Sequence, residues 1–365
     1  MKILIDDGMQ IKVGTGIGKY TKYLYTYMKE SKLFKSVDLV NYENIFSKSC
    51  NKKMMRIKYL MYINSKKYFE KMKDYDYVWF TNYIIPFRKP KNTKIIVTVH
   101  DLVSFLYPNT LPLLYRFYIR FFIKYAVKKS DIIFTVSNSS KNEIQNLFKK
   151  YSNKVKYFWP GIYDGISSDK IEDNFENHEL NKLDNQKYFL YVGTVEKRKN
   201  IDFIIEAFIE LKKNNEKAKG YKFVIAGRPG FGYKEFINKI NYLGYSNDFI
   251  FPGYVSDLDS NKLYCEAKAF VFPSVYEGFG SNQIECMKCK LPILLSDIPT
   301  NREISREYGL FFSLNDTNTL VEQMNKIVEN NYDYAEKEQI ATKYLKEFEW
   351  DLIIKDIYKV LKTEE

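Results

Sequence analysis

The feature that most constrains the fold of this chain is an alternation of short apolar segments with amphipathic ones along most of its 365 residues. The apolar segments of the first half have the length and composition of β-strands, and the segments between them carry apolar residues at helical spacing. Repeated strand–helix units predict a parallel sheet covered by helices. Strands are predicted at 2–6, 37–42, 77–80, 94–99 and 132–136, and helices at 17–30 and 113–128.

The alternation is interrupted at residues 167–186, which are polar and acidic and are typical of a linker. It then starts again at residue 188. We therefore predict two doubly wound domains, 1–170 and 186–349, with a last helix at 350–365 that packs back on the first domain. Ligands of such sheets bind outside the carboxyl ends of the strands, so the cleft between two facing domains is the expected site.

Composition sets the class of protein. Hydrophobic residues make up 45% of the chain, which indicates a globular fold. No apolar run is long enough for a membrane-spanning helix, and the first residues have the pattern of a strand, not of a signal peptide. Four cysteines without a disulfide framework fit a reducing cytoplasm. Cys286 and Cys289 form a single CxxC inside a helical pattern, and with only two histidines in the chain we expect packing there and no metal.

The formal net charge of +12 is concentrated locally. Residues 48–73 contain nine Lys or Arg against one acid. In the predicted helix 113–128, basic residues recur every four positions beside many aromatic ones, and this stripe can lie on an anionic membrane surface. A core helix with a solvated face is the alternative. Nucleic acid is not an expected partner, because no recognised binding module accompanies the charge. The stripe consists of Arg116, Arg120, Lys124 and Lys128.

Two acids flank a glycine-containing turn in the second half. Glu277 and Glu285 are separated in the pattern E-x7-E, after the apolar strand 269–273 and across the start of a helix. Gly278 and Gly280 allow the backbone to approach a ligand, and the helix start offers unpaired N–H groups to a phosphate. Carboxylates accept pairs of sugar hydroxyls. The pattern predicts a site for a nucleotide-linked sugar, although two solvated acids on a surface loop would show it as well.

Two cations follow another predicted strand of the same half. Arg198 and Lys199 lie in GTVEKRKN, between strand 188–193 and helix 201–213. Fixed cations at a strand's carboxyl end can stabilise the charge that develops on a departing diphosphate. A basic loop alone would not indicate a diphosphate site. Together with the acid turn in the same half of the chain, it does indicate one.

Several motifs in order along nearly the whole chain give it a family resemblance. YVGTVEKRKN, FVIAGRPG, FPGYVSD and FVFPSVYEGFGSNQIECMKCKLPIL lie in the second half, and TGIGKYT, VTVHDLVSFLYP and SDIIFTVSNSSKNEI in the first. With these motifs the chain resembles the family-4 glycosyltransferases of the GT-B fold, which have two facing Rossmann-like domains. The resemblance is greatest to bacterial O-antigen and capsule mannosyl- and rhamnosyltransferases.

The resemblance implies roles for individual residues. Arg198 and Lys199 would hold the diphosphate, Glu277 would contact the donor sugar, Glu285 would contact the ribose, and His100 would face the transferred sugar from the first domain. His100 would act by positioning and not as a general base. The family retains the anomeric configuration and needs no metal or other cofactor. The implied donor-binding residues are Gly16, Gly193, Arg198, Lys199, Gly278, Phe279, Gly280, Ser281, Asn282 and Glu285.

The chain departs from the family pattern at two places. Ser281-Asn282 replaces the Leu-Pro that often follows the glycine turn, and Cys289-Lys290 replaces Cys-Gly at the end of the helix. Both acids and both cations are retained, so the departures put only the donor's sugar and base in doubt. The glycine loop 14–19 matches neither a dinucleotide fingerprint nor a Walker A loop.

The sequence therefore predicts a cytoplasmic enzyme at the inner face of the plasma membrane. It would transfer a hexose or deoxyhexose from a nucleotide-diphosphate sugar to a glycan acceptor, for example one linked to polyprenyl diphosphate, in surface polysaccharide biosynthesis. A non-catalytic nucleotide-sugar-binding or scaffold protein on the same fold is the first alternative. A nicotinamide-dependent oxidoreductase is the second, but the chain lacks a dinucleotide fingerprint.

Overall fold

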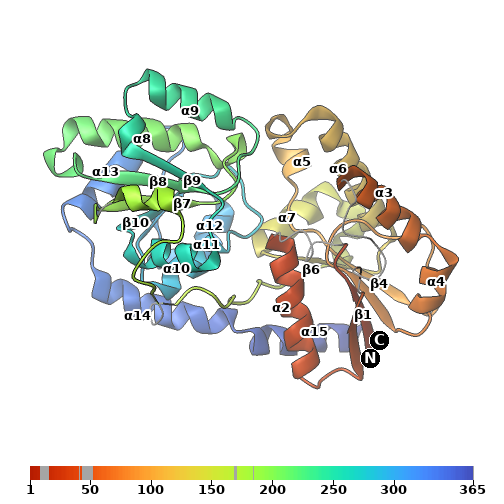
Figure 1. Cartoon of the computed structure of the whole chain (residues 1–365). Coiled ribbons are helices and arrows are strands. Elements are labelled where there is room, and N and C mark those ends of the chain that lie inside the picture. Colours follow the sequence, from red (N-terminus) through yellow and green to blue (C-terminus); the bar gives the residue numbers. More distant parts are fainter. Residues whose placement is uncertain (9–15, 41, 43–51, 168–170, 184, 365) are drawn as a thin grey trace. The chain divides into compact units, whose positions relative to one another are not determined.

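The computed structural model describes residues 1–8, 16–40, 42, 52–167, 171–183 and 185–364, which form two compact units (Figure 1). Unit 1 comprises Met1–Pro108, Pro112–Gly161 and Phe348–Glu365, and unit 2 comprises Asn109–Leu111 and Ile162–Glu347. Each unit contains one six-stranded sheet in which the paired strands are parallel. This architecture confirms the predicted α/β fold with two Rossmann-like domains.

The sheet of unit 1 has the strand order β2-β1-β3-β4-β5-β6. After β2 the chain returns to the other side of β1, so the order reverses between β1 and β3, and the carboxyl ends of these two strands form the switch point where ligands bind in such sheets. Its strands are β1 (Lys2–Asp6), β2 (Ser36–Leu39), β3 (Tyr77–Phe80), β4 (Lys94–Thr98), β5 (Ile132–Thr135) and β6 (Val155–Tyr157). Its α-helices are α2 (Gly16–Glu30), α3 (Lys52–Ile63), α4 (Lys66–Met72), α5 (Val103–Leu106), α6 (Leu113–Lys129), α7 (Asn138–Leu147) and α15 (Trp350–Thr363).

The sheet of unit 2 has the order β12-β11-β10-β7-β8-β9, with its switch point between β7 and β10. Its strands are β7 (Tyr188–Val192), β8 (Lys222–Ala226), β9 (Phe249–Gly253), β10 (Ala269–Phe272), β11 (Ile293–Ser296) and β12 (Leu310–Phe312). Its α-helices are α8 (Ile201–Asn214), α9 (Tyr233–Tyr242), α10 (Asp257–Glu266), α11 (Asn282–Lys288), α12 (Pro299–Ser305), α13 (Asn318–Val328) and α14 (Tyr334–Leu345).

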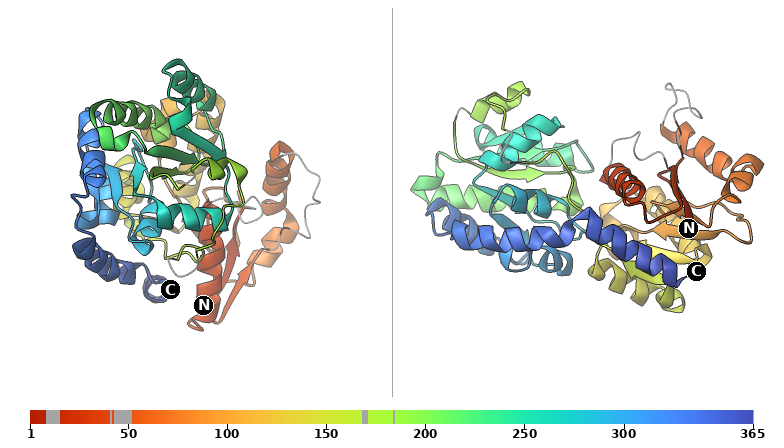
Figure 2. Two further views of the ribbon diagram at one scale, coloured as in Figure 1. Left: turned by 60° about the vertical axis from the view of Figure 1, so that its left-hand side comes forward. Right: turned by 90° about the horizontal axis from the view of Figure 1, so that it is seen from below.

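The last helix of the chain, α15, belongs to unit 1, where it lies alongside α2 (Figures 1 and 2). Trp350 is buried at its start and stacks on Tyr23 and Tyr27 of α2, with ring centroids 6.3 and 5.8 Å away. Near its other end, the Leu361 carbonyl accepts a hydrogen bond from the Tyr77 hydroxyl at 3.1 Å. These contacts connect the C-terminal segment to both α2 and the central sheet.

The stretch predicted to be a linker is packed against unit 2. The backbone N–H groups of Glu176 and Asn177 donate to the Asp259 carboxylate at 2.7 and 3.1 Å. Leu180 and Leu183 are buried in the core of unit 2. The linker prediction for 167–186 was therefore wrong for the described residues 171–183. The prediction rested on the acidic composition and overlooked Leu180 and Leu183. Their spacing of three residues places both on one face of a helical turn, which can be buried.

The packing of α15 can be tested at Gly161. A Cβ atom at this position would lie 2.6 Å from two ring carbons of Trp350. Overpacking of this kind costs about 1–3 kcal/mol, so we expect Gly161→Ala to lower the urea midpoint of unfolding. The control is Gly220→Ala, because a Cβ at Gly220 has no heavy atom of the described chain within 4 Å. Equal midpoints for both variants would contradict this packing.

Candidate functional site

The switch point of unit 2 brings together the two motifs that the sequence separates by about eighty residues. The segment after β7 carries Arg198 and Lys199, and the segment after β10 carries Glu277. These segments are joined by a backbone hydrogen bond from Val275 N to Arg198 O at 3.1 Å. Because β7 and β10 are parallel neighbours, their carboxyl ends meet at one edge of the sheet.

Both cations converge on one carboxylate oxygen. Oε1 of Glu277 lies 2.5 Å from Lys199 Nζ and 3.3 Å from Arg198 Nη1. The Arg198 guanidinium also donates to the Tyr276 carbonyl and to Glu196 Oε1, each at 2.9 Å. We call Arg198, Lys199 and Glu277 the ion triad. Glu196 lies within the same motif, but the sequence analysis did not assign it a role.

The ion triad is largely withdrawn from water, with side-chain exposures of 20% for Arg198, 11% for Lys199 and 9% for Glu277. Burial alone would raise the pKa of the Glu277 carboxyl, but the charges of Lys199 and Arg198 outweigh it and hold this pKa below its ordinary value. Burial lowers the pKa of Lys199 more than Glu277 raises it, and the charge of Arg198 adds to the lowering. Glu277 is thus the counterion of both cations, and Glu196 is a second counterion of Arg198.

A buried polar network supports the turn that carries Glu277. Thr300 Oγ1 donates to the Glu277 carbonyl at 2.9 Å, and Ser296 Oγ donates to the Ser274 carbonyl at 2.6 Å. Asn301 Nδ2 donates to the Ser296 carbonyl at 2.9 Å and its Oδ1 accepts from Gln283 at 3.0 Å. The sequence analysis missed this network, because a single Ser at the end of β11 and single Thr and Asn residues on α12 show no periodic pattern.

Two predicted glycines occupy positions that a side chain would disrupt. Gly193 follows β7 with φ +154°, and a Cβ there would be 2.9 Å from the Tyr191 hydroxyl oxygen. Gly280 has φ +83°, and a Cβ there would be 2.6 Å from the Gln283 amide nitrogen. Gly278 and Phe279 lie in the same turn, and Ser281 directly precedes α11.

Glu285 lies on α11, one helical turn after Asn282, and interacts with the buried Tyr264 hydroxyl. Asn282 Nδ2 donates to the same hydroxyl at 2.6 Å and to the carbonyl of Val192, the last residue of β7, at 3.3 Å. The structure therefore brings Arg198, Lys199 and Glu277 into contact and places Glu285 beside Tyr264. The ligand roles of all four remain predictions.

The predicted residues of unit 1 lie near its own switch point. His100 follows β4, and its Nε2 donates to the Thr81 carbonyl at 2.8 Å, while its ring meets Tyr20 edge-on. Burial lowers the pKa of His100, so the imidazole is neutral with its proton on Nε2. Gly16 is exposed at the start of α2, and a Cβ there would have no heavy atom of the described chain within 4 Å. The loop glycine at 14 lies outside the described residues.

A buried carboxylate at the end of β1 was not predicted. Asp6 is fully buried and accepts hydrogen bonds from the hydroxyls of Tyr42, Tyr59 and Tyr68. Burial raises the pKa of Asp6 against the effect of these donors. Its backbone carbonyl accepts from Thr81 N at 3.0 Å, and the Thr81 carbonyl in turn binds His100. Asp6 thus connects β1 to the segment that positions the histidine.

The predicted cationic stripe of α6 does not form one exposed face. Arg120 Nε donates to the Ser104 carbonyl at 2.6 Å, and Arg116 is only partly exposed, with its Nε buried. Lys124 and Lys128 are exposed. Much of the remaining exposed surface of α6 is apolar, because Leu113, Leu114, Phe117 and Phe121 are each 56–84% exposed. Positions four residues apart do not stay on one line along a helix, so Arg120 turns toward α5 while the two lysines face solvent.

The neighbouring helix α3 continues this apolar surface. Arg56 of α3 lies over the Tyr115 ring of α6 at 5.6 Å, and α3 and α6 lie side by side in Figure 1. We call the following residues the α3–α6 surface: Met54, Ile57, Met61, Leu113, Leu114, Phe117 and Phe121, which are all at least half exposed.

Two classes of feature are absent from the described residues. Among them, no group of three or more His, Cys, Asp or Glu side chains could hold a metal ion. None of the described helices has both the length and the apolar character that a bilayer-crossing segment requires.

Comparison with known proteins gives the relationships of the chain. Residues 172–348 match the family model described as glycosyl transferases group 1. The chain is similar to O-antigen chain mannosyltransferase B of Escherichia coli, with 29% identity over 68% of this chain and 65% of the relative. It is also similar to O-antigen chain mannosyltransferase RfbU of Salmonella typhimurium, with 29% identity over 60% and 57% of the two chains. The matches therefore span less than two thirds of these relatives.

Solved structures share the fold over the whole chain. One is WaaG, a glycosyltransferase involved in lipopolysaccharide biosynthesis, with a TM-score of 0.69, 15% identity, and coverage of 98% of this chain and 99% of WaaG. Another is Anabaena Alr3699/HepE in complex with UDP and glucose, with a TM-score of 0.71, 14% identity and full coverage of both chains. The chain has the GT-B fold and resembles O-antigen mannosyltransferases.

The ion triad makes a testable contribution to stability. Because the folded-state pKa of Glu277 lies below the ordinary value of 4.5, the unfolded chain binds more protons between these two values. The stabilisation by Glu277 is therefore present above about pH 4.5 and is lost as the pH falls through the folded-state pKa. We expect Glu277→Gln to cost about 3 kcal/mol at pH 7, because it removes the counterion of the buried Lys199, and less at acidic pH.

Urea unfolding at a series of pH values measures this difference. The matched control is Glu235→Gln, since Glu235 pairs with Lys197 at 2.8 Å but is 66% exposed. An exposed pair contributes about 0–1 kcal/mol. A Glu277 variant with wild-type stability at pH 7, or with a constant deficit at every pH, would contradict the role of the carboxylate as shared counterion.

Proposed function

Because residues 172–348 match the family model of glycosyl transferases group 1, we propose that this chain is a retaining glycosyltransferase. It moves a hexose or deoxyhexose from a nucleotide-diphosphate sugar to a glycan acceptor. The similarity to two O-antigen chain mannosyltransferases supports a place in surface polysaccharide biosynthesis, with a lipid-linked acceptor.

The observation that carries this proposal is the ion triad. Arg198 and Lys199 follow β7 and converge on the Glu277 carboxylate, Arg198 also pairs with Glu196, and a diphosphate can bind the same cations. As the bond between sugar and phosphate breaks, negative charge grows on the departing oxygen. Lys199 and Arg198 are fixed by their neighbours before the reaction, so they stabilise this charge without reorganising.

The other residues take the parts of the donor that do not react. Glu277 accepts hydrogen bonds from hydroxyls of the transferred sugar, and Glu285 binds the ribose hydroxyls. Backbone groups at 278–282 and the glycines at 16 and 193 leave room for the phosphates. Neutral His100 contributes Nδ1 as an acceptor toward the sugar. In this mechanism the departing phosphate takes the acceptor's proton on the face where the new bond forms.

We propose that no metal is needed. The two fixed side-chain cations of unit 2 provide the charge that a divalent ion would otherwise supply to the diphosphate. Activity should therefore persist in the presence of a strong chelator.

Substitution of Lys199 tests the proposal most directly. We expect Lys199→Met to lower kcat/KM by about 10²–10³-fold, the usual loss when one charge-stabilising donor is removed. Lys197→Met is the matched control, because Lys197 belongs to the same basic run but pairs with Glu235 on α9. The donor is first identified by thermal shift with GDP-, UDP-, dTDP- and CMP-sugars. Donor binding without transfer or hydrolysis in the wild type would favour the non-catalytic alternative.

We further propose that the α3–α6 surface binds an anionic bilayer, which would bring unit 1 to a lipid-linked acceptor. Large apolar side chains such as Leu114 and Met61, 84% and 70% exposed, can insert among lipids. The exposed cations Arg56, Lys124 and Lys128 complement the negative charge of lipid headgroups. We therefore propose that the protein acts at the inner face of the plasma membrane.

Vesicle flotation with and without anionic lipid tests this surface. Burial of a large apolar side chain contributes about 1.5–3 kcal/mol, so the double variant Leu114→Asp/Phe117→Asp should bind vesicles at least tenfold more weakly. Lys124→Glu/Lys128→Glu should weaken binding only to anionic vesicles. The control is Tyr242→Asp, because Tyr242 is 90% exposed but lies on α9 of unit 2. Wild-type binding by the Leu114/Phe117 variant would contradict the proposal.

A further inference from the structure

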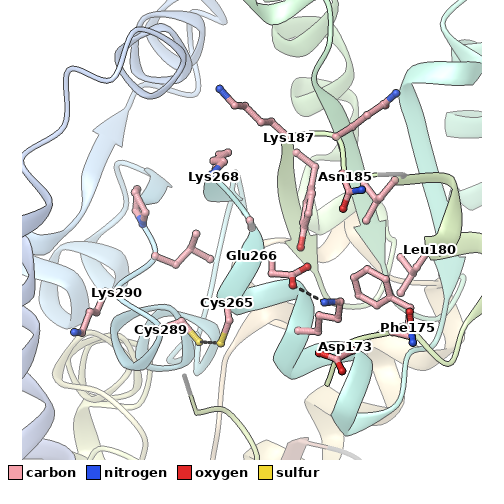
Figure 3. A pocket seen from close by; sticks show the side chains of 18 of the residues that line it. Asp173, Phe175, Leu180, Asn185, Lys187, Cys265, Glu266, Lys268, Cys289 and Lys290 are labelled. Carbon is pink, nitrogen blue, oxygen red and sulfur yellow. Dashed lines mark hydrogen bonds and ion pairs between the residues drawn. The ribbon is translucent and has the colours of Figure 1, made fainter. Parts of the chain in front are cut away.

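Two cysteines of unit 2 face each other in a way that the sequence did not indicate. Sγ of Cys265, near the end of α10, lies 2.9 Å from Sγ of Cys289, directly after α11 (Figure 3). Both side chains are partly exposed, and both thiols are free. The CxxC spacing pointed to Cys286 as the neighbour of Cys289, but Cys286 is fully buried.

The thiol pair lines a pocket of about 910 Å³ at the amino ends of β7, β10 and β11. This edge of the sheet is opposite to the one that carries the ion triad. Its lining is polar, with Lys187, Lys268 and Lys290 among the lining residues beside the acids Asp173 and Glu266 (Figure 3). The volume is within the range that admits small molecules, and the lysines favour ligands with carboxylates.

We propose that Cys265 and Cys289 are a redox modification site: they form a reversible disulfide by exchange with a low-molecular-weight disulfide that enters this pocket. The site is distinct from the ion triad, and the formation of the disulfide does not depend on the proposed function. A metal site is a poorer fit for the pair, because the described residues provide no cluster of three ligands.

The hydrogen bond between the thiols sets the order of the reaction. The geometry allows either thiol to donate, and we assign the proton to Cys289. With Cys289 as the donor, the bond lowers the pKa of Cys265 and raises the pKa of Cys289. Cys265 is therefore the attacking thiolate. It forms a bond to one sulfur of the small disulfide RSSR and expels RS⁻, which takes up a proton as RSH.

The second step completes the exchange. Cys289 loses its proton and attacks Sγ of Cys265 in the mixed disulfide, which expels the second RS⁻. In total, two protein thiols are oxidised to one disulfide, and one RSSR is reduced to two RSH. The short distance between the two sulfurs favours this step over a lasting mixed disulfide.

The disulfide would restrain α11 against α10. Cys265 is adjacent to Tyr264, whose hydroxyl already binds Asn282 of α11. A covalent link at the other end of α11 would therefore fix the helix at two places. Asn282 and Glu285, two of the proposed donor-binding residues, lie on α11. An effect of the disulfide on donor binding would therefore rest on the proposed function, whereas the restraint of α11 does not.

Peptide mapping by mass spectrometry tests the site in the full chain. Cys50 lies outside the described residues, so the protein carries Cys50→Ser throughout. After treatment with oxidised glutathione and alkylation, we expect a linked peptide that joins Cys265 to Cys289 and disappears with dithiothreitol. Cys289→Ser should accumulate glutathione on Cys265, because the resolving thiol is missing. Cys265→Ser should react with glutathione much more slowly at Cys289.

Three results would overturn the proposal. The first is full alkylation of both thiols after oxidation, and the second is a Cys286–Cys289 link. The third is equal glutathione labelling of the two single variants, which would remove Cys265 as the attacking thiol. The control Cys286→Ala should leave the linked peptide unchanged. Amide hydrogen exchange over 282–288 should slow in the oxidised protein, and unchanged exchange would refute the restraint of α11.

Discussion

The shared carboxylate of Glu277 is the interaction on which the candidate site depends. Glu277 lies on the turn after β10 and forms ion pairs with Arg198 and Lys199, which follow β7. Burial disfavours the charged form of Lys199, and the negative charge of Glu277 opposes this effect. Without ligand, Glu277 and Glu196 are the counterions of these cations. A diphosphate can bind the same two cations, so the contacts that hold the empty site together also position it for an anion.

Much of this arrangement could be predicted, because local patterns carry it. Apolar segments that alternate with helical ones define the strands, and polar motifs directly after strands 188–192 and 269–272 place Arg198 and Glu277 at strand ends. What the sequence does not contain is the strand order. The motifs meet because β10 pairs with β7, and this pairing between segments far apart in the chain is fixed only in the folded sheet.

The features that were missed depend on such long-range contacts. Arg120 was expected on an exposed stripe, but α5 offers it the Ser104 carbonyl, and the exposed side of α6 is apolar instead. Asp6 had no motif around it, and its three tyrosine partners come from separate segments. Cys289 finds its neighbour on another helix rather than three residues away. In each case the partner is distant in sequence, where neither periodicity nor spacing can identify it.

The division of the chain also has a consequence for how the protein is made. Apart from three residues, unit 2 is a single continuous segment that ends at Glu347, whereas unit 1 needs Trp350 and the rest of α15 to cover α2. Synthesis runs from the N-terminus, so all of unit 2 has been synthesised before α15, which unit 1 needs to complete its core. The aromatic surface of α2, with Tyr23 and Tyr27, therefore stays uncovered on the ribosome until α15 has been synthesised.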